Sequence, residues 1–442
     1  MKTFKIGGIH PKGNKISAQQ PIEVVPIPQT VYIPVSQHLG SPAKPLVEKG
    51  DFVKTGQLIA KGEGFISANV HSSVSGKVLK VDEIKDYCGY RRLSIIIESD
   101  GDEWMDTIDR TSELITECFL EPKAIINKIH EMGIVGMGGA TFPSHVKLNV
   151  PDGKKAEYLL INGVECEPYL TSDHRLMLEK GREIMVGITI LMKSLQVNRA
   201  MIGIENNKTD AIHRMNSLAS EFKGITVHAL KVKYPQGAEK QLIKALVNRE
   251  VPSGKLPIEV GCVVHNVGTA YAVYEAVQKN KPLIERIVTV TGKSVKKPSN
   301  LLTRIGTPIN ELIIMTGGLP EDTGKIISGG PMMGRALSST EAPITKGTSG
   351  ILLMTDKESK RNKPLNCIRC GHCVTVCAMG LEPFLLAKLS ENQSWEEAEA
   401  EHIMDCMECG SCQFTCPSAR PLLDHVRLGK NKVAQIIRTR KN

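Results

Sequence analysis

The chain has 442 residues, of which 41% are hydrophobic and only 4% aromatic, and it carries a formal net charge of +9. This length suggests about three domains, since roughly 150 residues per domain is a useful guide. The basic residues are densest at 357–363 and 427–441. Solvated segments are the simplest interpretation, and contact with anionic lipid or an acidic redox partner is the alternative. Nucleic-acid binding is disfavoured, because no aromatic or glycine-rich recognition motif accompanies the charge.

The N-terminus and the apolar runs argue against a signal peptide and against a membrane span. Residues 1–5 contain lysines with no apolar core behind them. The longest apolar stretch, at 184–192, is far shorter than the roughly 20 residues that a helix needs to cross a bilayer. We therefore expect a soluble or peripheral protein in a reducing compartment, where thiolates can bind metal.

The first 110 residues predict an arm followed by a small β domain. Residues 1–30 are rich in Pro, Gly and Lys and indicate an extended arm. Residues 31–110 alternate short strands with glycine turns, and this pattern resembles the barrel-sandwich domains that carry lipoyl or biotinyl groups. Those domains present a lysine on a hairpin tip, where this chain has Glu63-Gly64-Phe65-Ile66. We therefore expect the domain to be structural.

The middle of the chain alternates strands and helices. This alternation over 115–255 predicts an α/β domain with a mainly parallel sheet. Strands are expected at 158–161, 200–204 and 225–228, and helices at 176–195, 211–222 and 239–247. Further on, the pattern predicts a small α+β unit at 256–338, a linker at 339–362, a helical cysteine-rich domain at 363–430 and a basic tail at 431–442.

Eight of the twelve cysteines form two copies of one motif. The run Cys367-x2-Cys370-x2-Cys373-x3-Cys377 recurs 39 positions later as Cys406-x2-Cys409-x2-Cys412-x3-Cys416. This is the spacing of two-cluster ferredoxins, in which the fourth cysteine of each run ligates the other cluster. The sequence therefore predicts two [4Fe–4S] clusters, one held by Cys367, Cys370, Cys373 and Cys416, and the other by Cys406, Cys409, Cys412 and Cys377.

Other uses of these cysteines are weaker interpretations. Zinc needs four ligands, usually from two C-x2-C pairs, and would leave the third and fourth cysteines of each run without a role. Disulfides would need an oxidising compartment. The scattered cysteines are expected to be buried structural thiols, and they are Cys88, Cys118, Cys166 and Cys262.

A glycine loop and an acidic segment form the second signal. The loop runs from Gly136 to Pro143 and is followed by Lys147. Its backbone N–H groups could cradle a phosphate, with Lys147 reaching the phosphate or an anionic flavin ring; a structural turn is the alternative. Asn162, Glu165 and Glu167 follow a predicted strand, and strand ends are where open α/β sheets bind ligands. A helix N-cap is the alternative role for Glu165.

Over nearly its whole length the chain resembles the C subunit of the Rnf-type ferredoxin:NAD oxidoreductase, an ion-translocating membrane complex. The resemblance runs from the segment 64–73 to the cysteine repeat. The middle of the chain also resembles the flavin- and NADH-binding subunit of respiratory complex I, through G-x-G-G-A-x-F-P-x-x-x-K at 136–147, N-x-x-E-x-E at 162–167 and Y-x-x-G-x-E at 234–239. Val164 and Ala238 stand where those elements carry acids, and His265-Asn266 replaces a pair of asparagines.

The resemblance implies a multidomain α/β and α+β fold. Its parts are an N-terminal barrel-sandwich, a Rossmann-like FMN/NADH domain, a β-grasp domain of the SLBB type and a helical two-cluster ferredoxin-like domain. It implies NAD(H) as substrate, stacked near Phe142, with Glu165, Glu167 and Glu239 lining the site. It implies non-covalent FMN held by Gly136, Gly138, Gly139, Lys147, Asn162, Tyr234, Gly237 and Asn266.

The function implied is electron transfer in a membrane complex. The chain would be a peripheral subunit at the cytoplasmic face of the bacterial inner membrane, in contact with membrane subunits and with the ferredoxin-accepting subunit, and would couple ferredoxin oxidation to NAD reduction. FMN is needed because NAD exchanges two electrons as a hydride and a [4Fe–4S] cluster exchanges one. A flavin and iron–sulfur cobalamin reductase and a non-catalytic cluster scaffold are the alternatives. Whether H⁺ or Na⁺ is translocated is left open.

Overall fold

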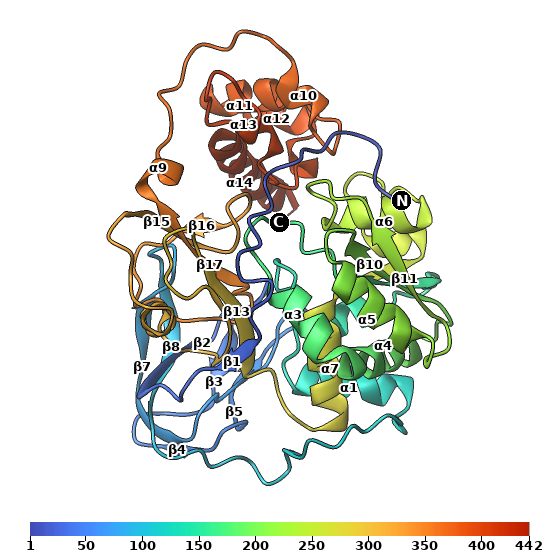
Figure 1. Cartoon of the computed structure of the whole chain (residues 1–442), viewed down its shortest axis with the longest axis vertical. Coiled ribbons are helices and arrows are strands. Elements are labelled where there is room, and N and C mark those ends of the chain that lie inside the picture. The colour runs from blue at the N-terminus through green and yellow to red at the C-terminus, as the bar shows by residue number, and fades with distance from the viewer. Residues whose placement is uncertain (442) are drawn as a thin grey trace.

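The computed structural model describes residues 1–441 and consists of four regions (Figure 1). Two β-rich regions lie together at one side of the molecule, an α/β domain lies at the other, and a small helical domain sits at one end above both. This layout confirms the predicted fold class. None of the helices in residues 1–441 has the length and apolar character needed to span a bilayer. Asn442, the last residue of the predicted basic tail, lies outside the described residues.

The N-terminal β region consists of two small antiparallel sheets, with orders β2-β8-β7-β4 and β3-β5-β6. Aliphatic side chains alternate into its core, such as Val31 and Ile33 on one strand and Ile95 and Ile97 on its neighbour. The segment 63–66 joins β5 to β6, and Phe65 there is 72% exposed. The strands are β2 Thr30–Pro34, β3 Ala43–Pro45, β4 Phe52–Val53, β5 Leu58–Gly62, β6 Val70–His71, β7 Gly76–Lys85 and β8 Arg91–Ser99.

The α/β domain is built on a parallel sheet of order β11-β10-β9-β12, the Rossmann-like arrangement. Strand β12 pairs with β9, so β12 and α7 belong to this domain and the predicted boundary at 255/256 is wrong. A short apolar run does not reveal which sheet it joins. The elements are β9 Tyr158–Asn162, β10 Ala200–Glu205, β11 Ile225–Leu230, β12 Cys262–Asn266, α1 Pro122–Glu131, α2 Ser144–Leu148, α3 Ser172–Glu179, α4 Gly181–Leu195, α5 Thr209–Ala219, α6 Glu239–Val247, η1 Pro257–Val260 and α7 Val267–Gln278.

The helix predicted at 176–195 is two helices in the structure, because the chain leaves helical geometry at Lys180 between α3 and α4. Helix α4 packs closely on α7. A Cβ atom at Gly187 would lie 1.9 Å from the carbonyl oxygen of Ala270, so only glycine permits this approach. The close pair of helices covers the sheet and fixes the position of the α7 N-terminus, where a candidate ligand site lies.

The third region is a six-stranded sheet of order β1-β14-β13-β17-β15-β16. The N-terminal arm supplies its edge strand β1, and the segment predicted as a linker supplies β17 beside β13. The linker prediction is therefore wrong at 350–355, an apolar run hidden among Lys, Ser and Thr residues. The elements are β1 Ile22–Val24, β13 Glu285–Thr291, β14 Ser299–Arg304, α8 Ile309–Met315, β15 Thr323–Ser328, β16 Arg335–Ala336, β17 Gly350–Thr355 and α9 Asp356–Ser359.

The C-terminal domain shows the predicted repeat in its backbone. Gly371 and Gly410 occupy equivalent positions, have φ of 74° and 77°, and each begins a four-residue helix, α10 or α13. A left-handed conformation here suits glycine. Residues 431–441 of the predicted tail continue α14. The elements are α10 His372–Thr375, α11 Pro383–Glu391, α12 Trp395–Ala400, η2 Ile403–Asp405, α13 Ser411–Phe414 and α14 Leu422–Lys441.

Candidate functional site

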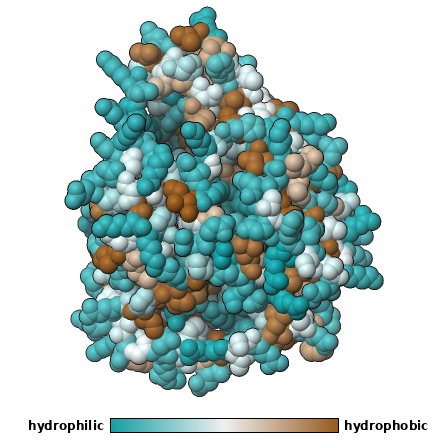
Figure 2. All heavy atoms as spheres, in the orientation of Figure 1, coloured by the Kyte–Doolittle hydropathy of each residue, from teal (hydrophilic) through white to brown (hydrophobic). Residues whose placement is uncertain are grey.

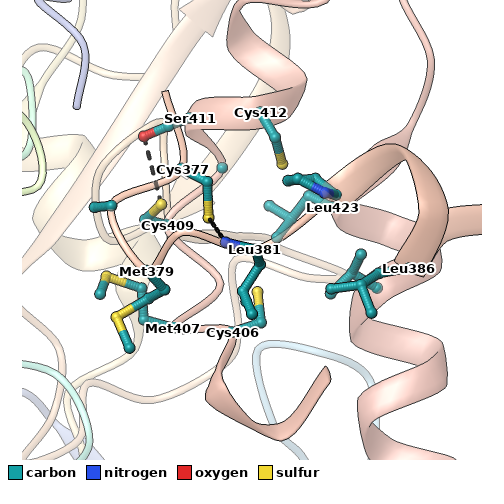
Figure 3. Close-up of a pocket in the computed structure, with 14 residues that line it drawn as sticks. Cys377, Met379, Leu381, Leu386, Cys406, Met407, Cys409, Ser411, Cys412 and Leu423 are labelled. Atoms are coloured by element: carbon teal, nitrogen blue, oxygen red, sulfur yellow. Dashed lines mark hydrogen bonds between the residues drawn. The ribbon is translucent and has the colours of Figure 1, made fainter. Parts of the chain in front are cut away.

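Four cysteine side chains border one cavity in the helical domain (Figure 3). Cys406, Cys409 and Cys412 come from the second run, and Cys377 is the fourth cysteine of the first run. Apolar side chains, including Leu381, Leu386, Met407 and Leu423, form the rest of the wall. The crossover predicted from the spacing thus has its counterpart in the structure, where the fourth thiol lies with the three of the other run.

Without a cluster, the electrostatics of this cavity keep its thiols protonated. Burial raises the pKa of Cys406 to about 11 and raises that of Cys412 further, and the neighbouring thiols add to both shifts. The irons of a bound cluster would reverse this effect, since metal-bound thiols are deprotonated. In residues 1–441 no three His, Cys, Asp or Glu side chains converge closely enough to hold a single ion. The four thiols surround a space instead, and their soft donor atoms and number fit a [4Fe–4S] cluster.

The other four cysteines differ in their exposure. Cys367 and Cys370 are exposed, Cys373 is buried and Cys416 is partly buried. Burial raises the pKa of Cys373, and the neighbouring Cys416 adds to the shift. Cys416 therefore lies near the first run and does not line the cavity of its own run. The structure thus brings Cys373 and Cys416 together across the two runs, and the four thiols are soft donors of the kind that a [4Fe–4S] cluster takes.

The glycine loop lies against the junction of β12 and α7. Its base is closed by a hydrogen bond from the Gly136 amide to the Phe142 carbonyl (2.8 Å). At its tip Gly138 and Gly139 are exposed, and no atom lies within 4 Å of the place where a Cβ at Gly139 would stand. A Cβ at Gly138 would be 3.3 Å from the Cβ of Asn266. The tip therefore leaves its backbone open on one side.

Strands β9 and β12 bring two asparagines to the same edge of the sheet, where Asn162 and Asn266 are register partners. The Asn162 amide donates to the Gly237 carbonyl (2.7 Å). The Asn266 carbonyl oxygen accepts from the Gly268 amide and so caps α7 (2.8 Å). Lys147 lies nearby on α2. Its ammonium donates to Glu239 Oε1 (2.7 Å) and to the carbonyl of Val264 on β12 (3.2 Å).

The residues predicted for FMN that meet here fit a phosphorylated flavin. The open backbone of the glycine tip and the Lys147 ammonium are donors suited to an anion. The amides of Asn162 and Asn266 donate to Gly237 and to the Asp173 carboxylate (2.6 Å), so these two residues shape the sheet edge beside the tip. His265 adds an unsatisfied group, because its buried Nε2 atom has no hydrogen-bond partner. Burial, with a smaller effect from Lys147, lowers the pKa of His265 to about 3, so the ring is neutral and can donate or accept one bond.

The acidic residues of the predicted NADH site have partners of their own. The Glu165 carboxylate accepts from the Asp173 amide (2.8 Å) and the His174 amide (3.4 Å) in the first turn of α3. This is the helix-capping alternative, reached through an unusual backbone, since Glu165 has a φ of 45°. Glu167 accepts from the amides of Met332 (3.1 Å) and Met333 (2.8 Å) in the loop between β15 and β16. Burial raises the Glu167 pKa to about 7.

Tyr234, predicted as a flavin contact, joins the two candidate sites. Its side chain is buried, and its hydroxyl donates to the carbonyl oxygen of Cys409 in the cluster loop (2.8 Å) and lies close to the Glu167 carboxylate. The N-terminal arm adds a second connection. Ile9 forms a bridge with Tyr234, and the Gly8 amide donates to Val376 next to Cys377 (2.9 Å). The Cys377 cavity is thus attached directly to the α/β domain.

Three charged residues near the site have no sequence motif. The Lys15 ammonium, from the arm, donates to the carbonyls of Glu165 (2.8 Å), Glu167 (2.8 Å) and Leu170 (2.6 Å). Lys208 donates to the carbonyl of Val164 in the same loop (2.8 Å). Arg286 of β13 donates to the carbonyl of Met137 in the glycine loop (2.9 Å). Each reaches a backbone atom far away in the sequence, and such contacts leave no pattern by which to find them.

Replacing Lys15 with methionine is expected to destabilise the protein by about 3 kcal/mol at neutral pH, because three carbonyls lose a charged donor. Burial, with a contribution from Lys208, lowers the Lys15 pKa from 10.5 to about 8. The unfolded chain therefore binds more protons at this site between these values, and the contribution of Lys15 to stability should rise from pH 8 to 10.5. Urea unfolding across this range should show that the rise in unfolding free energy due to Lys15 is absent in Lys15→Met. The control variant Lys12→Met, which replaces an exposed lysine on the same arm, should keep that rise. Equal behaviour of the two variants would contradict the assignment.

Models of known protein families match four parts of this chain. A barrel sandwich hybrid domain described as that of RnfC matches residues 2–102, the Nuo51 FMN-binding domain matches 129–275, an SLBB domain matches 287–336 and a 4Fe-4S dicluster domain matches 366–419. The FMN-binding match spans the glycine loop, both asparagines and β12. The dicluster match spans both cysteine runs.

Full-length relatives are also similar, and each is the C subunit of a complex. That of the proton-translocating ferredoxin:NAD(+) oxidoreductase complex of Clostridium ljungdahlii is 48% identical, over 98% of this chain and 94% of the relative. The C subunit from Acetobacterium woodii, of a Na(+)-translocating ferredoxin:NAD(+) oxidoreductase complex, is 46% identical over 98% of this chain and 97% of the relative. The C subunit from Rhodobacter capsulatus, of an ion-translocating oxidoreductase complex, is 40% identical over 98% of this chain and 84% of the relative.

Proposed function

Because the chain belongs to the family of C subunits of ion-translocating ferredoxin:NAD⁺ oxidoreductase complexes, we propose that it carries electrons between NAD(H) at its α/β domain and a protein acceptor at its C-terminal domain. Its cofactors are FMN and two [4Fe–4S] clusters. The observation that carries the proposal is the hydrogen bond from Tyr234 to Cys409, because it joins the flavin-binding domain to a cluster loop within one chain.

The residues of the α/β domain have separable tasks in this proposal. FMN supplies the conversion between a two-electron hydride and single electrons. Gly138 and Gly139 leave room for its phosphate, and Lys147 offsets negative charge on it. Asn162 and Asn266 fix the edge of the sheet on which it rests. Phe142, which is partly buried, and Glu239, which is paired with Lys147, lie on the side proposed for NADH.

Glu165 and Glu167, which follow β9, have different proposed roles. Glu165 caps α3, so its proposed part in the NADH site is to hold the loop that carries Glu167. Glu167, with a pKa of about 7, changes charge in the neutral range and lies between the Met332–Met333 loop and Tyr234. Its carboxylate is the better candidate for a contact with the ribose or carboxamide of NADH.

The cluster assignment gives the order in which electrons would pass through the two clusters. The set Cys377, Cys406, Cys409 and Cys412 lies beside Tyr234 and is proposed as the cluster nearer to FMN. The set Cys367, Cys370, Cys373 and Cys416 then connects to the outside. A peripheral position at the cytoplasmic face of the inner membrane, and coupling of ferredoxin oxidation to NAD reduction, complete the proposal.

Two variants separate the flavin contacts from the NADH contacts. Lys147→Ala removes a charge-assisted bond and should weaken FMN binding by about 1.5–3 kcal/mol, or roughly 10- to 150-fold. Glu167→Gln should keep FMN but slow NADH oxidation with ferricyanide as acceptor. The measurements are released flavin per chain and the anaerobic rate of NADH oxidation. Parallel loss of flavin and activity in Glu167→Gln would place that glutamate outside the NADH site.

A further inference from the structure

The segment between α9 and α10 is exposed to solvent along its whole length. Residues 360–370 contain no helix or strand, and every one of them is exposed. In Figure 1 this segment runs along the outside of the helical domain before it enters α10. It is held to that domain by a bond from the Leu365 amide to the Ser418 carbonyl (2.9 Å) and by an ion pair between Arg361 and Asp424 (2.5 Å).

Apolar side chains on this segment lie beside two cluster thiols. Leu365 is 64% exposed and Ile368 is 67% exposed, and they flank Cys367 in the sequence. Cys370 is exposed as well. Figure 2 shows apolar atoms among hydrophilic ones at this end of the molecule. Large apolar side chains around an exposed redox ligand are unfavourable in water and favourable at a protein contact.

The charge of the segment has one sign. Residues 360–370 carry Lys360, Arg361, Lys363 and Arg369 and no acidic residue. Of these four, Arg361 is paired in the structure, with Asp424. Basic residues around an apolar centre are the arrangement that steers an acidic partner and fixes its orientation.

The two cluster sites therefore differ in what they face. The Cys377 set is partly buried and adjoins the flavin-binding domain through Tyr234. The Cys367 set has two exposed thiols on the open segment. One site is placed to exchange electrons within the chain, and the other to exchange them with another molecule.

We propose that residues 360–370 form a docking surface for an acidic face of another subunit of the complex, which exchanges single electrons with the cluster at Cys367, Cys370, Cys373 and Cys416. In each exchange the cluster loses one electron and a one-electron centre of the partner gains it, or the reverse, with no bond broken and no proton moved. A protein occupant is favoured over a membrane surface, because the apolar residues lie at the redox ligands and a lipid accepts no electron. The proposal rests on the function proposed above.

The test uses a charge-reversing variant and a matched control. Lys360→Glu, Lys363→Glu and Leu365→Ser are combined, and none of these residues is a cluster ligand. The control combines Lys155→Glu, Lys223→Glu and Leu256→Ser on the α/β domain, where both lysines are exposed and Leu256 is 68% exposed. Binding of each iron- and flavin-loaded chain is measured to the detergent-solubilised remainder of the complex, purified from cells that lack this chain.

The segment variant should bind the remainder about tenfold more weakly at low salt and with a smaller salt dependence, whereas the control should bind like the wild type. Unchanged binding of the segment variant would overturn the proposal. So would a selective loss of its binding to protein-free vesicles of phosphatidylcholine and phosphatidylglycerol with normal binding to the remainder, since that outcome assigns the segment to lipid. If the triple variant loses iron, Lys360→Glu with Lys363→Glu alone carries the test.

A second measurement separates this proposal from the function on which it rests. NADH oxidation by the isolated chain with ferricyanide, a small acceptor that needs no docking surface, should be the same in the segment variant and the wild type. Inactivity of both would count against the proposed function while the binding result still stands. Activity of both with unchanged binding would count against the docking surface alone.

Discussion

Replacing Cys377 with serine is expected to remove the cluster held by Cys406, Cys409 and Cys412, although Cys377 belongs to the other run. The reason is its place in the wall of their cavity. A [4Fe–4S] cluster needs four thiolate ligands, and the largely apolar walls of this cavity offer no replacement for the missing one. Iron per chain should fall from about eight to about four after anaerobic purification. The remaining four irons should give the spectrum of a single cluster.

The identity of the surviving cluster is the discriminating readout. Under the crossover assignment, Cys377→Ser and Cys409→Ser lose the same cluster and should show the same remaining electron paramagnetic resonance signal. Cys367→Ser and Cys416→Ser should both retain the other one. Cys88→Ser, at a cysteine outside both runs, should keep all the iron. If the Cys377→Ser signal matched that of Cys409→Ser no better than that of Cys367→Ser, the ligands would not cross over.

The prediction of the cluster sites rests on local information. Ligand spacing within each run and the copy 39 residues later specify eight side chains without knowledge of the rest of the fold. The prediction of the glycine loop and of Asn162 as flavin contacts is similarly local, since both belong to short elements that follow one another in the α/β domain. Glu165 shows the limit of such reasoning, because capping a helix and contacting a nucleotide both call for a carboxylate at the same position.

The features that sequence did not reveal depend on distant pairings. Strand β17 and strand β12 are short apolar runs, and their sheets are decided by neighbours such as β13 and β9. Lys15 binds carbonyls about 150 residues away, and nothing in the sequence around it distinguishes it from the exposed lysines of the same arm. Arg286 likewise reaches Met137 from another domain. Backbone acceptors have no residue identity, so no motif records these contacts.

Removing FMN while keeping both clusters is expected to abolish NADH oxidation. A cluster accepts one electron at a time and no hydride, so NADH has no acceptor in the protein without flavin. The isolated chain holds flavin and clusters together, so in its complete form it should oxidise NADH with ferricyanide. The flavin-depleted protein should show the iron content and cluster absorbance of the complete protein, with a rate at background.

Refilling completes the test. Added FMN should restore the rate in proportion to flavin bound, and Lys147→Ala should need a roughly 10- to 150-fold higher FMN concentration for the same recovery, following its expected loss in affinity. Riboflavin, which lacks the phosphate, should restore less at equal concentration if the tip at Gly138 and Gly139 receives that phosphate. Protein replete in flavin and iron that reduced no acceptor with NADH would remove the nucleotide site from 136–147. The chain would then act as a scaffold that holds two clusters beside an α/β domain, with Tyr234 as a structural link between the two domains.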